Sequence, residues 1–256
     1  MKRSKSYLEV FCLLSYFESR LKVDFDNFNE IRLKLEFCEK LGLKNLILEP
    51  KNKIRSIDSD LKSKIENVTA LNIFFRFNLI PNSLHEFKKD LELFRAFPYI
   101  LSVETQDKEI QLHAAKDSRI DVITFSEPEI IKTITPGVIS LASQNNTFIE
   151  LALAPILVPK NKTIQSKNFR NLYRFVQFSD KLKGNYIICG NFDDIYDLRN
   201  PRALISICNT LLGMPLNKAK QGFSDNIIKL LEKVELRRDK SIIETGVRII
   251  KGGDQK

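Results

Sequence analysis

Short apolar, β-rich runs alternate with amphipathic helical patterns along almost the whole chain of 256 residues. Several of these runs are apolar at successive positions, as expected for strands that are buried on both faces. Alternating strands and helices are typical of a parallel sheet covered by helices, and seven strands favour an α/β fold of the TIM-like (β/α) barrel class. The predicted strands span Tyr7–Leu14, Asn45–Leu48, Leu71–Phe77, Tyr99–Val103, Asp121–Phe125, Phe148–Leu153 and Tyr186–Cys189.

Helix start and stop signals agree with this pattern. Asn27 and Ser83 are each followed three residues later by a glutamate, which predicts reciprocal capping of the first unpaired amides. Asn200 precedes a proline, the favoured residue of a first helical turn. Gly42 and Gly213 follow two of the helical patterns and predict left-handed helix ends.

The apolar periodicity fades from Glu235 onward, where charged residues dominate. We therefore predict one barrel domain over residues 1–234 and a charged, mostly exposed C-terminal tail over residues 235–256.

Composition narrows the compartment and the class of partner. No uncharged apolar stretch approaches the roughly 20 residues that a membrane span needs. The four cysteines are widely separated and have apolar neighbours, which indicates reduced core residues of a cytoplasmic protein. With 41 basic and 32 acidic residues the formal net charge is +9, which favours a polyanion such as nucleic acid as the partner.

The chain has few of the residues and motifs that a catalytic barrel uses to bind metals or nucleotides or to supply a nucleophile. It has only two histidines, neither in a metal-binding spacing, and no nucleotide-binding glycine loop or nucleophile elbow. We predict no catalytic residue, no protein-bound metal and no cofactor. Asp193 and Asp194, after the last predicted strand, are the best candidates for a paired acid site or an Mg²⁺ contact. Their residue types favour a polar loop instead.

A basic segment between residues 160 and 183 carries seven cations and one acid, a local charge of +6. A helix from about Gln165 places four of these cations on one stripe and Phe169, Leu172 and Val176 on the opposite face. Few acids are interleaved, so we predict contact with phosphates, although a merely solvated helix face is the alternative. The predicted RNA-binding residues of this segment are Lys160, Lys162, Lys167, Arg170 and Arg174, with Lys181 on the same stripe.

Further cations lie near the ends of predicted strands and helices, where arginine could bind phosphate in bidentate fashion. For Arg76 and Arg119 a structural ion pair is an equally good interpretation. The additional RNA-binding candidates are Arg76, Lys116, Arg119, Arg199 and Arg202.

Several stretches resemble the ribonuclease P protein component 3 family of archaeal and eukaryotic type. Residues 103–125 contain an Ala-Ala-x-Asp-x-Arg-x-Asp signature between two strands, and residues 198–214 contain Leu-Arg-x-Pro-Arg and Leu-Gly-Met. The strand FIELALAPIL at residues 148–157 and the unit LGLKNLIL at residues 41–48 also match. The resemblance extends over nearly all of the chain up to about residue 234.

The resemblance implies a TIM-like barrel related to metal-dependent phosphoesterases but without their metal centre. It implies a subunit of ribonuclease P, the endoribonuclease that removes 5′ leaders from precursor tRNA. In that family the RNA subunit performs the cleavage with Mg²⁺, and the protein pairs with protein component 2. Ribonuclease P RNA is then the direct partner and precursor tRNA an indirect one.

The working hypothesis is a polypeptide that has no catalytic group of its own and binds and stabilises the catalytic RNA. One alternative is a metal-dependent barrel phosphoesterase that uses Asp193 and Asp194. The other is a scaffold that does not bind RNA and whose surface charge only keeps it in solution.

Overall fold

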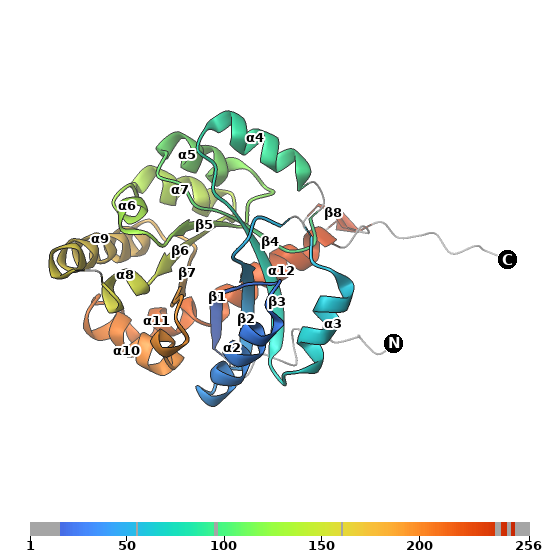
Figure 1. Ribbon diagram of the computed structural model, residues 1–256. Coiled ribbons are helices and arrows are strands. Elements are labelled where there is room, and N and C mark those ends of the chain that lie inside the picture. Colours follow the sequence, from blue (N-terminus) through green and yellow to red (C-terminus); the bar gives the residue numbers. More distant parts are fainter. Residues whose placement is uncertain are drawn as a thin grey trace, which may run out of the picture.

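The computed structural model describes residues 16–54, 56–94, 97–159 and 161–238, together with the backbone of 242–244 and 247–248. Seven parallel strands form one sheet in the order of the sequence, from β1 to β7. The first and last strands lie next to each other: the backbone N–H of Gly190, just after β7, donates to the Glu18 carboxylate of β1 at 3.0 Å. The sheet is therefore a nearly closed barrel with helices outside it (Figure 1). The strands are β1 (Phe17–Val23), β2 (Asn45–Pro50), β3 (Asn72–Leu79), β4 (Ile100–Val103), β5 (Val122–Phe125), β6 (Phe148–Ala152) and β7 (Tyr186–Cys189).

The helices follow the strands in a β/α alternation. A short antiparallel pair, β8 (Ile242–Glu244) and β9 (Val247–Arg248), comes after the barrel. The helical segments are α2 (Phe28–Lys40), α3 (Ser59–Asn67), α4 (Leu84–Leu93), α5 (Lys108–Lys116), α6 (Pro128–Ile131), α7 (Pro136–Gln144), α8 (Ala154–Leu157), α9 (Lys162–Lys181), the 3₁₀ turn η1 (Ile195–Asp197), α10 (Pro201–Thr210), α11 (Leu216–Gly222) and α12 (Asp225–Arg238).

The predicted helix starts and ends are confirmed by hydrogen bonds, but the capping at Asn27 is not reciprocal, because the Glu30 carboxylate binds Lys34 and Lys51. The Asn27 side chain accepts from the Glu30 N–H, and Ser83 Oγ accepts from the Glu86 N–H. The Glu86 carboxylate reaches the Asn82 N–H instead of the Ser83 N–H, so this capping is displaced by one residue. Asn200 caps α10, and Gly42 and Gly213 both have positive φ. Local side-chain chemistry thus sets where these helices begin and end.

Six of the seven predicted strands are confirmed. The predicted strand over residues 7–14 lies outside the described residues, and the strand that pairs with β2 is β1, further along the chain. The sequence of β1 is FESRLKV. Four of its seven residues are polar or charged, yet all residues of the strand except Lys22 are buried. Apolar periodicity does not find such a strand, because its inward-facing side chains are charged rather than apolar.

Apolar side chains fill the end of the barrel where the strands begin, and α12 covers that end. Figure 1 shows α12 passing behind the strands. The residues of this layer are Phe17, Ile47, Ile100, Val122, Phe148 and Ile187 from the strands and Ile227, Leu230, Leu231 and Val234 from α12.

The last turn of α12 is tied to the same end of the barrel. Residue 234, the predicted domain boundary, lies inside α12, and the helix continues to Arg238. The Arg237 guanidinium makes two hydrogen bonds of 2.9 Å to the buried carboxylate of Asp121 and others to the carbonyls of Phe97, Tyr99 and Arg119. Arg237, which falls in the segment predicted as an exposed tail, is therefore mostly buried against the barrel.

Candidate nucleic-acid interface

The basic helix α9 presents one face to the barrel and one to solvent. Its N-cap is Asn161, whose side chain accepts from the Ile164 N–H at 2.8 Å. Leu172, Phe175 and Val176 are buried against the core, and Phe169 is half-buried. The cations on the opposite face are all exposed, as the spacing predicts. We call this set the α9 stripe; it consists of Lys167, Arg170, Arg174 and Lys181.

The charge of the α9 stripe is not neutralised by nearby acids. In the described part of the chain, none of its four cations has a carboxylate oxygen within the 4.0 Å limit of an ion pair. The one acid of the helix, Asp180, pairs with Lys218 instead. Arg174 lies 5.8 Å from the ring centre of Phe178, a cation–π contact that leaves its charge in place. The stripe is thus available to an external anion.

A groove of about 470 Å³ runs between α9 and the short helix α6. Lys167, Arg170 and Arg174 line one side of it, and Lys132 lines the other. Lys132 is paired with Glu129, so the free charge is on the α9 side. The groove adds the amide group of Asn171 to the cations, and such a mixture of donors contacts phosphate and sugar oxygens in nucleic-acid complexes. The amide of Asn168, which also lines the groove, is buried and donates to the Pro155 carbonyl.

The other predicted cations are distributed over both ends of the barrel. Lys162, Arg199 and Arg202 are exposed near the carboxyl ends of the strands. Arg199 donates to the carbonyls of Tyr196 and Leu198, so it also holds its own loop. Lys116 ends α5 and is exposed at the opposite end of the barrel. Lys160 lies outside the described residues.

Arg119 is a structural residue. Its Nε and Nη2 donate to the two carboxylate oxygens of Asp117 at 2.9 and 2.6 Å, and its Nη1 lies 3.4 Å from the Leu91 carbonyl. This hydrogen bonding from Arg119 lowers the pKa of Asp117. Of the charged residues of the sequence signature, Arg119 and Asp121 thus bind other parts of the barrel, and Asp117 holds Arg119. The ion-pair interpretation holds for Arg119, and because 35% of its side chain is exposed, RNA contact stays a prediction.

The prediction that Arg76 contacts RNA is wrong. Only 1% of the residue is exposed, because it points into the barrel from β3. Its Nη1 lies 2.7 Å from a carboxylate oxygen of Glu150, its Nε lies 3.1 Å from one of Glu49, and its Nη2 donates to Thr124. An RNA phosphate cannot reach a guanidinium that is enclosed by strands on every side.

Arg76 belongs to a buried charge cluster that sequence reasoning missed. Arg20 of β1 makes two hydrogen bonds of 2.9 Å to Glu49 and one of 2.6 Å to Glu104. The residues come from five different strands or strand ends, and each ion pair joins residues more than two dozen positions apart, so no local pattern reveals them. We define the buried charge cluster as Glu18, Arg20, Glu49, Arg76, Glu104 and Glu150.

Burial and the arginines set the ionisation of this cluster. Burial alone would raise the pKa of Glu150, but Arg76 and Arg20 outweigh it and hold the pKa below its ordinary value. The same balance, with Arg20 as the main counter-charge, lowers the pKa of Glu104. Glu18 has no arginine side chain bonded to it and accepts only backbone N–H groups, so burial raises its pKa to about 7. Glu18 therefore changes its protonation near neutrality.

Two guanidinium groups supply the positive charge at the centre of this barrel. Within the described ranges, no group of three or more His, Cys, Asp or Glu side chains is placed to hold a metal ion. The arginines lie between the glutamates and use their carboxylate oxygens as acceptors. The arrangement is a structural ion-pair network.

Asp193 and Asp194 have the loop role that their residue types favour. Asp194 is the N-cap of η1, where its carboxylate accepts from the Tyr196 N–H at 2.9 Å. Asp193 is exposed beside it.

No described helix is long and apolar enough to cross a membrane.

Comparison with known proteins agrees with the fold. A family model described as RNase P subunit p30 matches residues 19–239. A chain from the cryo-EM structure of archaeal ribonuclease P with mature tRNA superposes with a TM-score of 0.74 at 17% identity, covering 93% of this chain and 100% of that chain. At this identity the superposition shows the shared TIM-like fold. No curated protein matches the sequence. Since the family model spans most of its length, the chain belongs to the RNase P subunit p30 family and is a protein subunit of ribonuclease P, which acts in tRNA processing.

Proposed function

We propose that this subunit binds and stabilises the RNA of ribonuclease P through the α9 stripe, and that the RNA with its Mg²⁺ carries out the cleavage. The observation that supports this most strongly is the exposed row of cations without acidic partners. Such a row attracts phosphates, because each phosphate that it neutralises releases a condensed counterion. Arg199 and Arg202, with Lys162, extend the proposed surface toward the carboxyl end of the barrel.

The stripe is tested by replacing Arg170 and Arg174 together with alanine. We expect RNA affinity to fall by at least tenfold at low salt, since each phosphate contact contributes roughly 0.7 to 0.9 to the slope of log affinity against log salt. Folding stability should change by only about 0.5 kcal/mol per residue, because both side chains are exposed. Filter binding of ribonuclease P RNA over a salt series measures affinity and slope together.

A matched control is the double variant Arg32→Ala with Arg238→Ala. It removes the same charge from two exposed arginines, and each of these has a nearby glutamate on its own helix. We expect it to keep most of the RNA affinity and the full salt slope. If both double variants lose affinity equally, general charge rather than the α9 stripe binds the RNA.

The division of labour between protein and RNA is tested by reconstitution. Precursor tRNA is incubated with the RNA subunit and Mg²⁺ in the presence and absence of this chain, and also with the chain alone. We expect the chain to increase cleavage by the RNA and to show no cleavage by itself with Mg²⁺ or Mn²⁺. Cleavage by the isolated polypeptide that is abolished by Asp194→Asn would support a phosphoesterase instead.

We also propose that protein component 2 is the partner subunit and that the complex works in the cytoplasm. Exposed apolar residues support a protein partner: Leu211 and Leu216 flank the turn at Gly213, against which the half-exposed Tyr173 packs. The buried free cysteines fit a reducing compartment. Co-purification with component 2, and its loss in Leu211→Asp with Leu216→Asp, tests the pairing. The variant Leu33→Asp, at another exposed leucine, is the control.

A further inference from the structure

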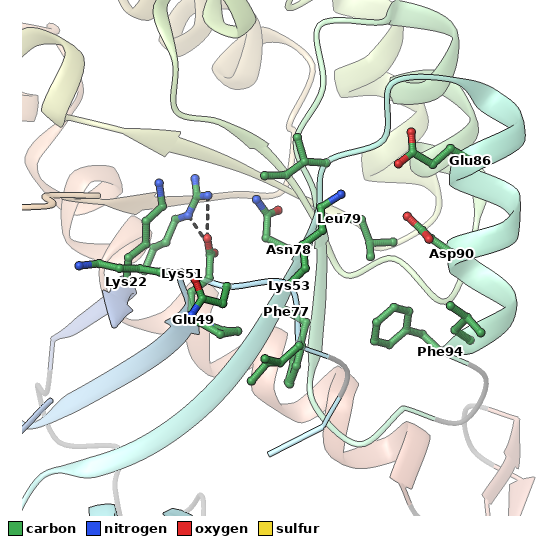
Figure 2. Close-up of a pocket in the computed structure, with 16 residues that line it drawn as sticks. Lys22, Glu49, Lys51, Lys53, Phe77, Asn78, Leu79, Glu86, Asp90 and Phe94 are labelled. Atoms are coloured by element: carbon green, nitrogen blue, oxygen red, sulfur yellow. Dashed lines mark hydrogen bonds and ion pairs between the residues drawn. The ribbon is translucent and has the colours of Figure 1, made fainter. Parts of the chain in front are cut away.

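A second site lies on the other side of the barrel from α9. A pocket of about 390 Å³ opens where β1, β2 and β3 end, between the loop at residues 50–54 and helix α4. Its volume is within the roughly 300 to 1,000 Å³ of small-ligand sites. Figure 2 shows Lys22, Lys51 and Glu49 at one end of the pocket, Glu86 and Asp90 at the other, and Asn78 and Leu79 between them. The pocket is therefore charged with opposite signs at its two ends.

The positive end has an unused charge and an unused donor. Lys22 is half-buried on β1, and no described carboxylate lies within ion-pair distance of it. Arg20 also lines the pocket, and its Nη1 has no acceptor although its Nε and Nη2 bind Glu49 and Glu104. Lys51, by contrast, is bound to Glu30 at 2.7 Å. Lys22 is therefore the cation at this end that is available to a ligand, and Lys53, which also lines the pocket, is a second cation with no described carboxylate within ion-pair distance.

The other parts of the pocket are a negative end on α4 and apolar side chains between the two ends. Glu86 is bound to the backbone and side chain of Asn82, whereas Asp90 has no ion-pair partner among the residues that are described. Between the two ends, Ile80 and Leu93 are about half exposed, at 52% and 49%. Large apolar side chains that remain this exposed beside a pocket offer a surface for a flat apolar group.

We propose that this pocket holds one unstacked nucleotide of the bound RNA. Its phosphate lies toward Lys22, its base lies against Ile80 and Leu93, and an exocyclic amino group of the base donates to the Asp90 carboxylate. The proposal rests on the proposed function, because the nucleotide belongs to the RNA that the subunit binds. Unpaired bases that leave the stack are the usual targets of sequence-specific RNA recognition.

Simpler ligands leave part of the lining unused. An inorganic anion would satisfy Lys22 but neither the apolar walls nor Asp90. An acidic peptide would satisfy Lys22 and is repelled by Asp90, and an apolar side chain would leave both charges unpaired. A nucleotide with an amino-bearing base carries an anion, a flat apolar face and a hydrogen-bond donor in one molecule, which matches the three parts of the pocket.

The proposal is tested by titrating the full-length chain with cytidine 5′-monophosphate (CMP) and with uridine 5′-monophosphate (UMP), followed by calorimetry or NMR. The two differ at position 4 of the base, where CMP has the amino group. We expect saturable binding of CMP and about tenfold weaker binding of UMP, the size of one hydrogen bond to a charged group. Asp90→Asn should remove the preference for CMP, and Lys22→Gln should weaken both ligands about tenfold.

The matched controls are Lys44→Gln, an exposed lysine before β2 at the opposite end of the barrel, and Glu92→Gln, an exposed acid of α4 outside the pocket lining. Both should leave CMP binding unchanged, and Lys22→Arg should retain it. Absence of saturable CMP binding, equal binding of CMP and UMP by the unaltered chain, or displacement of CMP by inorganic phosphate at equal concentration would overturn the proposal.

Two further measurements separate this site from the α9 stripe and from a protein partner. Arg170→Ala with Arg174→Ala should lower RNA affinity but leave CMP binding intact, so either proposal can fail while the other stands. In the assembled ribonucleoprotein, Lys22 should be protected from an amine-modifying reagent by the RNA alone. Protection only by the partner protein would assign the pocket to that protein and overturn the nucleotide site.

Discussion

At the scale of single residues, the buried charge cluster shows how the same residue type takes opposite roles. Arg76 and Arg174 are both arginines flanked by aromatic residues, yet Arg76 is buried inside the barrel and Arg174 faces solvent. Arg76 compensates two buried glutamates: it shares Glu49 with Arg20 and is the nearest counter-charge of Glu150, so its removal would leave Glu150 without that partner. A buried carboxylate without a partner is far more costly than an exposed one.

We therefore predict that Arg76→Met lowers the free energy of unfolding by about 3 to 5 kcal/mol, the usual cost of removing one partner of a buried ion pair. Urea denaturation followed by circular dichroism measures it. Arg32→Met, at an exposed arginine, should cost no more than about 0.5 kcal/mol. Adding Glu150→Gln to Arg76→Met should recover part of the loss, because the orphaned charge is then gone. A loss below 1 kcal/mol for Arg76→Met would mean that the cluster relaxes without it.

At the scale of elements, α9 and α12 use basic side chains in two different ways. The cations of α9 point away from the barrel, whereas Arg237 of α12 is inserted between the segments that lead into β4 and β5. Lys233, one turn earlier, also lies 3.3 Å from Asp121. Burial lowers the pKa of Lys233, and Asp121 acts against that shift. Lys233 and Arg237 thus attach the last turns of α12 to the end of the barrel that this helix covers.

We predict that Arg237→Ala lowers the free energy of unfolding by about 2 kcal/mol, as expected for losing hydrogen bonds to a buried charged group. Arg238→Ala, at the neighbouring exposed arginine, is the control and should change it by about 0.5 kcal/mol or less. Thermal and urea unfolding of the two variants give the comparison. Equal effects would show that the last turn of α12 contributes nothing to closing the barrel.

At the scale of the whole molecule, the glutamates of the cluster change stability with pH in opposite directions. Glu104 and Glu150 have lowered pKa values, so their contribution is present above the ordinary pKa and is lost as the pH falls through the folded-state value. Glu18 has a pKa raised from 4.5 to about 7. Its contribution is present below the ordinary pKa and is lost as the pH rises through about 7.

We expect the contribution of Glu18 to stability to fall by up to about 3 kcal/mol as the pH rises from about 4.5 to about 7 and to level off above that, because only the folded state keeps this carboxyl protonated in that range. Glu18→Gln should remove this decline and leave the loss of stability at lower pH unchanged. Urea unfolding of both proteins at intervals of one pH unit measures the two curves. A decline of the same size between about pH 4.5 and 7 in Glu18→Gln would assign it to other groups.

The sequence by itself determined the features that depend on neighbours in the chain. Six strands, the caps at Asn27, Ser83 and Asn200, and the outward face of α9 all follow from local spacing and side-chain chemistry. The resemblance in the motifs indicated the family. None of these requires knowledge of what lies across the barrel, because helix faces and caps are set within a few residues.

Only the tertiary structure decided which charges are buried and which meet. β1 is a strand because its polar side chains Glu18 and Arg20 find partners on other strands, and Arg76 is structural because barrel closure encloses it. The pocket between α4 and the β2 loop arises in the same way, from segments that are distant in the chain. The physical reason is that the cost of burying a charge depends on its spatial neighbours, and these are fixed only when the sheet curls and its first and last strands meet.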